Sequence, residues 1–458
     1  MMTIHRNLTR LLVMAAAFAF VLSPAGPVVA GWLDGVKEMK IGKETHPVCP
    51  EDYLIKRGLP VREVPDEENA AIEYVKAMNL YVEVPGGLEK IHNYVLTEPW
   101  IEEAKALVPW LEKNAAAIAT IREGAKKKDC KFPLFGTPGM PVMGVLLPHL
   151  SVSRALARLL VVEGAYLEHQ SKYREALDMY LVAAKMGYHV SKEPFLISGL
   201  VGIACDAMAA RAIERCILRN RLDTATLSYL RDNLDGIGKA AESYEASMAS
   251  ERAFGISTVD DLFNRPSLFY EAFRGGEERV SRLKQVLPVV PGRSLGLRAI
   301  MKSDFRRYWN VMDEWIQLPD HIALRPENRH DQEFREDLPP WSLGRMLLPA
   351  LDRARISFVR NKATTAILTA QVALEMYRNK EGEYPQKLDQ LKGILGEIPV
   401  DPFTNEPLKY RRTEEGYVVY SVGEDLRDDG GKRGVTRYEP DIVGRYPLPP
   451  PKPFEARE

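Results

Sequence analysis

One pentapeptide of this chain has the spacing of a hydrolase nucleophile. Residues 292–296, Gly-Arg-Ser-Leu-Gly, fit the pattern Gly-x-Ser-x-Gly. That motif needs a buried strand before the serine, a helix after it, and an acid and a histidine further along a strand–helix sheet. Here Pro288 and Pro291 interrupt the preceding run, and His321 and His330 follow too closely for such a sheet to intervene. We therefore interpret the pattern as a chance match.

The histidines do not have the spacing of a zinc site. No two of them form His-x-x-x-His or His-Glu-x-x-His, the spacings that place two ligands on one helix face. His149 begins a predicted helix and His189 ends one, where an imidazole interacts well with terminal carbonyls, so structural roles are expected. Those that follow residue 30 are His46, His92, His149, His169, His189, His321 and His330.

The four cysteines are too few for a disulfide scaffold. Cys205 and Cys216 lie about 16 Å apart on a predicted helix, too far to form a bridge. They are expected to be buried as small apolar residues. Cys49 and Cys130 lie in predicted loops with prolines close by. They either pair in a disulfide or remain thiols.

The elements that must position these residues are mostly helical. Residues 31–65 read as a loop-rich segment, and apolar periodicity then predicts three helices before a Pro- and Gly-rich interruption at 132–148. Further helices follow in the centre of the chain, with Asp223 placed to cap one of them. The predicted helices cover residues 70–80, 87–96, 100–126, 156–167, 173–184, 195–218 and 223–247.

The strongest helical signal lies at residues 173–184, whose apolar positions recur at the spacing of one core-facing stripe. These are Tyr173, Ala176, Leu177, Tyr180, Leu181 and Ala184. The segment HQSKYREALDMY resembles the middle of a tetratricopeptide hairpin, but no second copy follows at the period of that repeat. Either an ordinary helical hairpin or a repeat unit is consistent with residues 151–190.

The chain from 250 to 345 is basic and aromatic, and it reads as a helical arm or a lid. Its rings, with Arg306 and Arg307 between them, form either a core stripe or a groove for glycan or peptide. These rings are Phe305, Tyr308, Trp309 and Trp315, and Trp341 lies further along the same segment. A long helix then covers 347–380, a β-hairpin joins 409–412 to 417–422, and a Pro-rich tail ends the chain.

Residues 366–431 resemble the soluble C-terminal domain of the major pseudopilin of type II secretion systems. The shared motifs occur in the family's order, and the resemblance implies a helical stem followed by a small antiparallel sheet. They are Tyr377-Arg378, Gly382, Tyr384-Pro385, Asp401-Pro402-Phe403, Tyr420-Ser421, Gly423 and Asp425.

The resemblance also implies a metal site. In that family an acidic Gly-rich loop binds one calcium ion, which takes six to eight oxygen ligands. Asp425 and Asp441 match the outer aspartates of the loop, and Asp428 and Asp429 lie between them before Gly430-Gly431. Leu426 stands where the family has glycine, and the interval between the outer aspartates is longer. The alternative is a solvated acidic turn.

The first thirty residues predict export. A basic start is followed by an apolar run at 11–22, too short to span a bilayer, and by a small-residue ending at Ala30. We expect a signal peptide cut after Ala30, or alternatively a retained anchor. A periplasmic or extracellular location follows. The family's hydrophobic polymerisation helix is absent, so we do not expect assembly into a pseudopilus.

The whole composition fits a soluble mature chain with large cores. Apolar residues make up 45% of the sequence, and 62 basic residues nearly balance 63 acidic ones, which argues against nucleic acid as a partner. No later segment reaches the length of an uninterrupted apolar span, so no transmembrane segment is expected after residue 30.

These observations predict a mainly α protein: a bundle of antiparallel helical hairpins followed by a small α+β domain. The expected parts are a signal peptide at 1–30, a loop-rich segment at 31–65, a helical domain at 66–345, a pseudopilin-like domain at 346–445 and a tail at 446–458. The favoured function is an exported, non-catalytic binding or scaffold protein of the cell envelope with a protein or envelope partner. The alternatives are a secreted hydrolase acting on an envelope polymer, with carboxylates in a cleft between bundle and arm, and a subunit that docks on a filament tip. The acids Glu163, Glu168, Asp178 and Glu193 lie in the predicted bundle, and the sequence does not give the distances that acid–base catalysis by a carboxylate pair requires.

Overall fold

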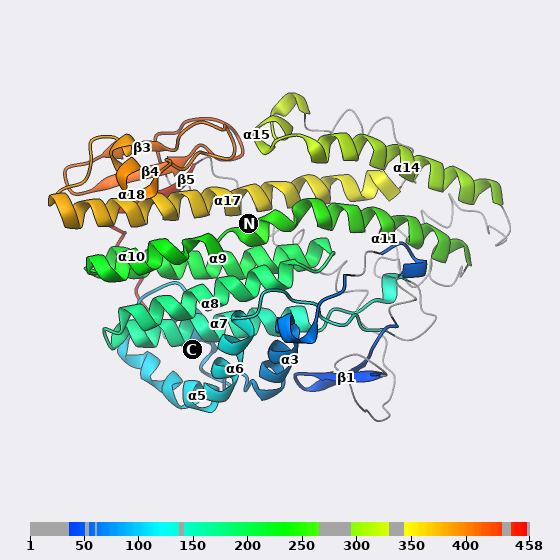
Figure 1. Ribbon diagram of the computed structural model, residues 1–458, viewed down its shortest axis with the longest axis horizontal. Coiled ribbons are helices and arrows are strands. Elements are labelled where there is room, and N and C mark those ends of the chain that lie inside the picture. Colours follow the sequence, from blue (N-terminus) through cyan, green and yellow to red (C-terminus); the bar gives the residue numbers. More distant parts are fainter. Residues whose placement is uncertain are drawn as a thin grey trace.

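The computed structural model describes residues 36–50, 55–59, 62–136, 142–264, 295–328, 343–432 and 441–455. Over these residues the protein is mainly helical, with two small antiparallel sheets of two and three strands (Figure 1). The predicted fold class, a helical bundle followed by a small α+β region, is confirmed.

The N-terminal segment contains a β-hairpin that the sequence did not predict. Strand β1 (Glu38–Ile41) pairs antiparallel with β2 (Glu44–Pro47). Ile41 is buried in the main hydrophobic cluster and Met39 packs against the same cluster. The strands have four residues each, too short for their alternation to be distinguished from a loop.

The helices predicted between residues 66 and 126 are present, but one of them is divided into shorter helices. The elements are η1 (Asp66–Glu68), α3 (Ala70–Leu80), α4 (Glu89–Val95), η2 (Glu102–Leu107), α5 (Val108–Lys113) and α6 (Ala115–Ala125). The single helix expected over 100–126 is interrupted at Asn114. This fully buried side chain accepts a hydrogen bond from the Val82 amide at 2.9 Å and donates one to the Val82 carbonyl at 3.1 Å. A contact with a distant loop therefore fixes a break that local periodicity does not show.

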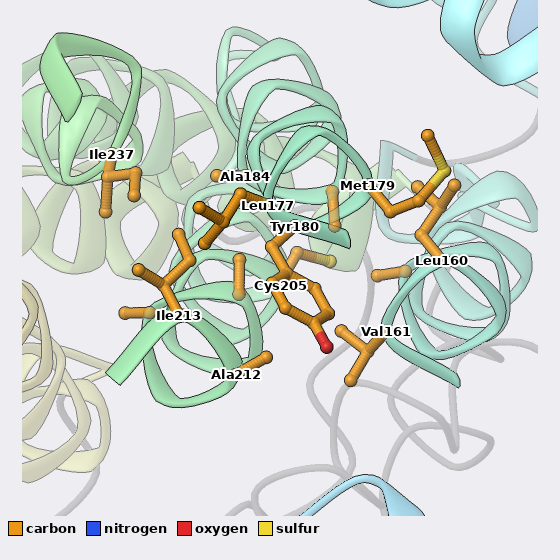
Figure 2. Close-up of a cluster of buried hydrophobic side chains, with 14 of the residues drawn as sticks. Leu160, Val161, Leu177, Met179, Tyr180, Ala184, Cys205, Ala212, Ile213 and Ile237 are labelled. Carbon is orange, nitrogen blue, oxygen red and sulfur yellow. The ribbon is translucent and has the colours of Figure 1, made fainter. Parts of the chain in front are cut away.

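Three long helices form the centre of the bundle. After η3 (Val142–Gly144) come α7 (His149–His169), α8 (Tyr173–Ser191) and α9 (Leu196–Arg219). The predicted stripe on α8 is confirmed, because Ala176, Leu177, Tyr180 and Ala184 are all buried. Figure 2 shows Tyr180 of α8 lying among Leu160 and Val161 of α7 and Cys205 of α9.

Helix α9 is long and apolar enough to cross a membrane by length and composition. In the structure 61% of its most apolar window is buried inside the protein. Its small residues Gly199 and Gly202 lie against neighbouring elements, so the helix is part of the core. The described residues thus contain no clear transmembrane segment.

The prediction of a single helix over 223–247 is wrong. The chain forms α10 (Thr224–Asn233), η4 (Leu234–Gly236), η5 (Lys239–Ser243) and α11 (Tyr244–Asn264). Asp223 does cap α10, since its side chain accepts a hydrogen bond from the Thr226 amide at 2.6 Å. The break follows from a second contact, in which the Gly238 amide donates to buried Asp206 of α9 at 2.6 Å.

The described aromatic side chains of the predicted arm belong to the hydrophobic core and do not line a groove. Its described helices are α14 (Leu295–Gln317), α15 (Asp320–Ala323) and η6 (Pro326–Asn328). Phe305, Tyr308, Trp309 and Trp315 are each exposed by 1% or less and belong to a second hydrophobic cluster. They therefore offer no open surface to a glycan. Trp341 and Ser294, with most of its pentapeptide, lie outside the described residues.

The C-terminal region is built on one long helix and a three-stranded sheet. Its elements are α17 (Leu343–Glu381), η7 (Leu388–Leu391), α18 (Lys392–Leu395), β3 (Lys409–Arg412), β4 (Tyr417–Ser421) and β5 (Ile442–Tyr446). The strands are antiparallel in the order β3-β4-β5. The predicted hairpin is confirmed as β3 and β4, whereas β5 was not predicted.

Helix α17 belongs to the bundle as well as to the sheet. Ile367, Leu368 and Leu374 lie in the same hydrophobic cluster as the residues of α7, α8 and α9, and Tyr417 and Val419 of β4 lie there too. Phe358 joins the second cluster with the aromatic arm. Figure 1 shows α17 running between the sheet and the central helices. The two parts expected from the sequence thus share one core.

The disulfide that the sequence left open between Cys49 and Cys130 is not formed. Both residues are buried, but Cys49 packs in a small cluster with Leu59, Val142 and Phe195. Cys130 instead lies in the main core, where burial holds the pKa of its thiol well above the usual range. Cys205 and Cys216 are buried as predicted.

Candidate functional site

The end of α17 is fixed by a buried charged network. Glu375 and Arg378 form an ion pair at 2.6 Å, and the Tyr384 hydroxyl donates to Glu375 at 2.8 Å while accepting from Arg378 at 2.8 Å. Gly382 has a φ of 81° and its amide bonds to the Arg378 carbonyl, so the helix ends in a left-handed cap. These are the Tyr-Arg and Gly-x-Tyr-Pro residues singled out in the sequence.

Asp401 joins two of the sequence motifs. Its carboxylate is 2% exposed and accepts hydrogen bonds from the Phe403 amide, the Ser421 hydroxyl and the Val422 amide, all at 2.8–2.9 Å. The Asp-Pro-Phe step and the Tyr-Ser-x-Gly end of β4 are therefore held together by one side chain. This arrangement places the following loop, residues 423–432, beside the sheet.

The acidic loop begins with a turn that glycine would adopt more easily. Asp425 accepts a hydrogen bond from the Arg427 amide at 3.1 Å. Leu426 between them has a φ of 58°, a left-handed conformation that is costly for a branched side chain. The Leu426 side chain is partly buried against the second hydrophobic cluster. Leu426 thus adopts a conformation that glycine would adopt more easily.

Asp428, Asp429 and Asp441 lie near one another. Asp428 accepts from the Tyr420 hydroxyl at 2.7 Å and from the Gly430 amide at 2.9 Å, and these bonds lower the pKa of its carboxyl. Asp441 accepts from the Gly431 amide at 2.8 Å. Burial raises the pKa of Asp441, and the charges of Asp429 and Asp428 raise it further. The loop therefore collects negative charge around a buried carboxyl.

The fit of these residues to a calcium ion depends on Asp441. It is 5% exposed, and its Oδ1 atom has no hydrogen-bond partner among the described residues. An oxygen of that kind is a suitable ligand for a hard cation, which would also offset the repulsion from Asp428 and Asp429. Asp429 and Asp428 are the acids whose charges raise the pKa of Asp441, whereas Asp425 accepts from the Arg427 amide. In the described ranges no three His, Cys, Asp or Glu side chains form a ready-made metal cluster.

Sequence reasoning missed the basic residues of the same region. Arg411, Lys432 and Arg445, with Val418, Asp429 and Gly430-Gly431, line a hollow of about 570 Å³ on the sheet. Side chains alternate between the two faces of the sheet along β3, which places Arg411 on the outer face. This alternation can be read from the sequence. The position of Arg445 depends on β5 pairing with β4, and that strand was not predicted.

The acids of the bundle are tied to separate partners. Glu168 pairs with Arg215 at 3.5 Å, and Asp178 pairs with Arg122 at 2.9 Å. Glu193 contacts buried His149 at 2.9 Å, and burial raises the pKa of Glu163. Glu168, Asp178 and Glu193 are thus held by different partners, as expected for structural groups. Neither His149 nor His189 is exposed, which agrees with their predicted structural roles.

A comparison with protein-family models, with curated proteins and with solved structures found no match. The resemblance to the pseudopilin domain therefore stays a prediction, carried by the motifs of residues 377–425.

Proposed function

We propose that this chain is an exported, non-catalytic binding or scaffold protein of the cell envelope that works with secretion or pseudopilus-like machinery. The helical bundle is the rigid body, and loop 423–432 beside the sheet is the part that meets a ligand or partner. The observation that carries the proposal is the position of this loop. Asp401 fixes its start, Gly431 and Asp441 fix its end, and α17 connects the sheet to the core.

A calcium ion has a structural role in this proposal. Asp441 would supply its unpartnered oxygen, and Asp428 or Asp429 a second carboxylate. The ion would offset three negative charges that otherwise repel one another, and it would stabilise the loop against the sheet. Binding to the folded state alone raises the free energy of unfolding.

Thermal unfolding of residues 31–458 with millimolar calcium and with chelator tests this role. We expect calcium to raise the Tm of the unmodified chain and to have no effect on Asp441→Asn, which keeps the shape of the side chain without its charge. Asp389→Asn is the matched control, since Asp389 is an exposed acid paired with Lys392 at 2.5 Å. A calcium shift of equal size in both variants, or none in the unmodified chain, would contradict the structural ion.

The scaffold function is tested separately by purifying the tagged chain from an envelope extract. We expect a stoichiometric protein partner that is lost when loop 423–432 is replaced by a Gly-Ser linker of equal length. A retained partner would place the interaction elsewhere on the bundle. Recovery of the chain alone, fully folded by circular dichroism, would count against a scaffold.

A further inference from the structure

Two arginines flank one apolar residue on the outer face of the C-terminal sheet. Arg411 of β3 is in register with Val418 of β4, and Val418 is in register with Arg445 of β5. Residues in one cross-strand row share a face, and the outer strands of three lie about 10 Å apart. Long side chains from both outer strands can therefore converge above the central residue.

The opposite face of the sheet is the one that packs on α17. A side chain at Gly444 would meet Ile367 and Gln371 of α17 at 2.6–2.8 Å, and Val419, its partner in register, is fully buried. Because neighbouring residues on a strand point to opposite faces, Val418 and Arg445 point away from the core. The arginine row is thus outside the hydrophobic interior.

The loop closes one side of this row and turns it into a hollow. Gly431 lies so close to the sheet that a Cβ atom there would be 2.7 Å from Val418 and 2.9 Å from Tyr420. Its φ of 72° is also a conformation that glycine favours. The loop consequently rests directly on β4, and Lys432 lies at the rim with Arg411 and Arg445.

The charge of the hollow is positive and is not compensated within the described residues. Three cations and one carboxylate, Asp429, line it. Neighbouring cations have partners, Arg412 with Glu383 at 2.8 Å and Lys409 with Glu406 at 3.4 Å. In the described part of the chain, Arg411, Lys432 and Arg445 have no such ion pair. The Nε atom of Arg445 is buried without a hydrogen-bond partner there.

We propose that this hollow binds a phosphate group, free or as an ester on a larger molecule. Arginine presents planar N–H groups that match the oxygens of phosphate, and two arginines facing each other can hold one such group between them. Lys432 adds a third charge, and Val418 provides an apolar floor. The phosphate proposal rests on neither the calcium ion nor the partner proposed above, although Asp429 and Lys432 of the same loop line the hollow.

The first test follows Tm as phosphate replaces chloride at constant ionic strength. We expect a saturable rise for the unmodified chain, and about tenfold weaker binding or more for Arg411→Gln and for Arg445→Gln, since each loses a charged hydrogen-bond donor. Arg411→Lys keeps the positive charge but lacks the planar N–H donors of the guanidinium group, and it should bind phosphate with intermediate affinity. The Tm of each variant in chloride alone shows that it folds.

Arg412→Gln is the matched control, because Arg412 is the next residue of the same strand and points to the other face. It should bind phosphate as the unmodified chain does. Equal weakening in Arg411→Gln and Arg412→Gln would show only general charge attraction and would overturn the site. The absence of saturable binding would overturn it as well.

Three probes distinguish the source of the phosphate. A free anion predicts tightest binding of inorganic phosphate, and a soluble ester predicts tighter binding of glycerol 3-phosphate. A lipid headgroup predicts sedimentation with phosphatidylglycerol vesicles that Arg445→Gln abolishes. If none of the three depends on Arg411 and Arg445, the proposal is wrong.

Discussion

Two buried titratable residues of the bundle respond to pH in opposite directions. His189 is fully buried with Tyr74 Oη 2.8 Å from its Nδ1 atom, and burial, with Lys185 and Lys192 adding, lowers its pKa to about 3. Asp206 is 1% exposed, and burial raises its pKa to about 7. Neither value is visible in the sequence, because each follows from loss of water around the group.

His189 should destabilise the protein in acid. Its folded pKa lies below the unfolded value of 6.5, so the unfolded chain binds more protons between pH 6.5 and about 3. The stability that neutral His189 contributes is present above pH 6.5 and is lost as the pH falls towards 3. Between pH 7 and pH 3.5, the free energy of unfolding of the unmodified chain should fall by on the order of 2–4 kcal/mol more than that of His189→Gln. Urea unfolding at stepped pH measures this, and parallel curves for the two proteins would contradict it.

Asp206 should have the opposite effect. Its folded pKa lies above the unfolded value of 3.8, so its contribution to stability is lost as the pH rises through about 7. Asp206→Asn keeps an acceptor for the Gly238 amide and removes the buried charge. We expect the variant to be more stable than the unmodified chain at pH 8, by on the order of 2 kcal/mol, and the difference to vanish near pH 4. A variant that is less stable at pH 8 would show that the ionised carboxyl is favourable in place.

At the scale of elements, the helical hairpin of α7 and α8 depends on a close approach. The position of Tyr180 leaves no room for a side chain at Gly164, where a Cβ atom would be 2.2 Å from the tyrosine ring. Figure 2 shows the ring pointing from α8 towards Val161 of α7. The stripe on α8 was predictable from periodicity, whereas this steric requirement of α7 was not.

Gly164→Ala should therefore destabilise the hairpin. Overpacking a dense core costs about 1–3 kcal/mol, and the ring has Glu168 and Arg215 as polar neighbours that restrict its movement. Gly393→Ala in α18 is the control, because nothing lies within 4 Å of its added Cβ and alanine favours a helix. Chemical denaturation compares the two. Equal stability of both variants would mean that Tyr180 moves without cost.

At the scale of the whole molecule, helix α17 and the Pro-rich tail both contact the helical bundle. Gln371 of α17 donates to Glu214 of α9 at 3.1 Å, and Leu374 is fully buried in the main cluster. The Pro-rich tail was expected to be extended, and it lies along the bundle. There the Tyr94 hydroxyl donates to the Lys452 carbonyl at 2.8 Å, and Arg219 donates to the Pro449 carbonyl. The molecule should consequently unfold as one unit.

Leu374→Ala tests this cooperativity. Removing a buried leucine costs about 2–5 kcal/mol, and the loss should reach both parts because the cluster is shared. We expect amide hydrogen exchange in β4 and in α8 to accelerate together. Leu80→Ala, at a position 47% exposed, is the control and should change neither. Faster exchange in β4 alone would show that the C-terminal region unfolds by itself.

The helical class, most helix positions, the capping role of Asp223 and the β3–β4 hairpin were predictable from the amino-acid sequence. These features depend on periodicity, caps and turns, which are properties of neighbouring residues. The sequence also identified Asp425, Asp428, Asp429 and Asp441 as an acidic group, and the tertiary structure showed that the charges of Asp428 and Asp429 act on buried Asp441. The calcium ion itself stays a prediction.

The remaining features were not predictable from the sequence, because each depends on contacts between distant segments. Asn114 breaks a helix by bonding to Val82, and Asp206 helps to end another by bonding to Gly238. The buried surroundings of Cys49 and Cys130 put them in different clusters. The arginine row exists because β5 pairs with β4 across a long interval of sequence. Local patterns carry no information on such pairings, which follow from how the whole chain buries its apolar surface.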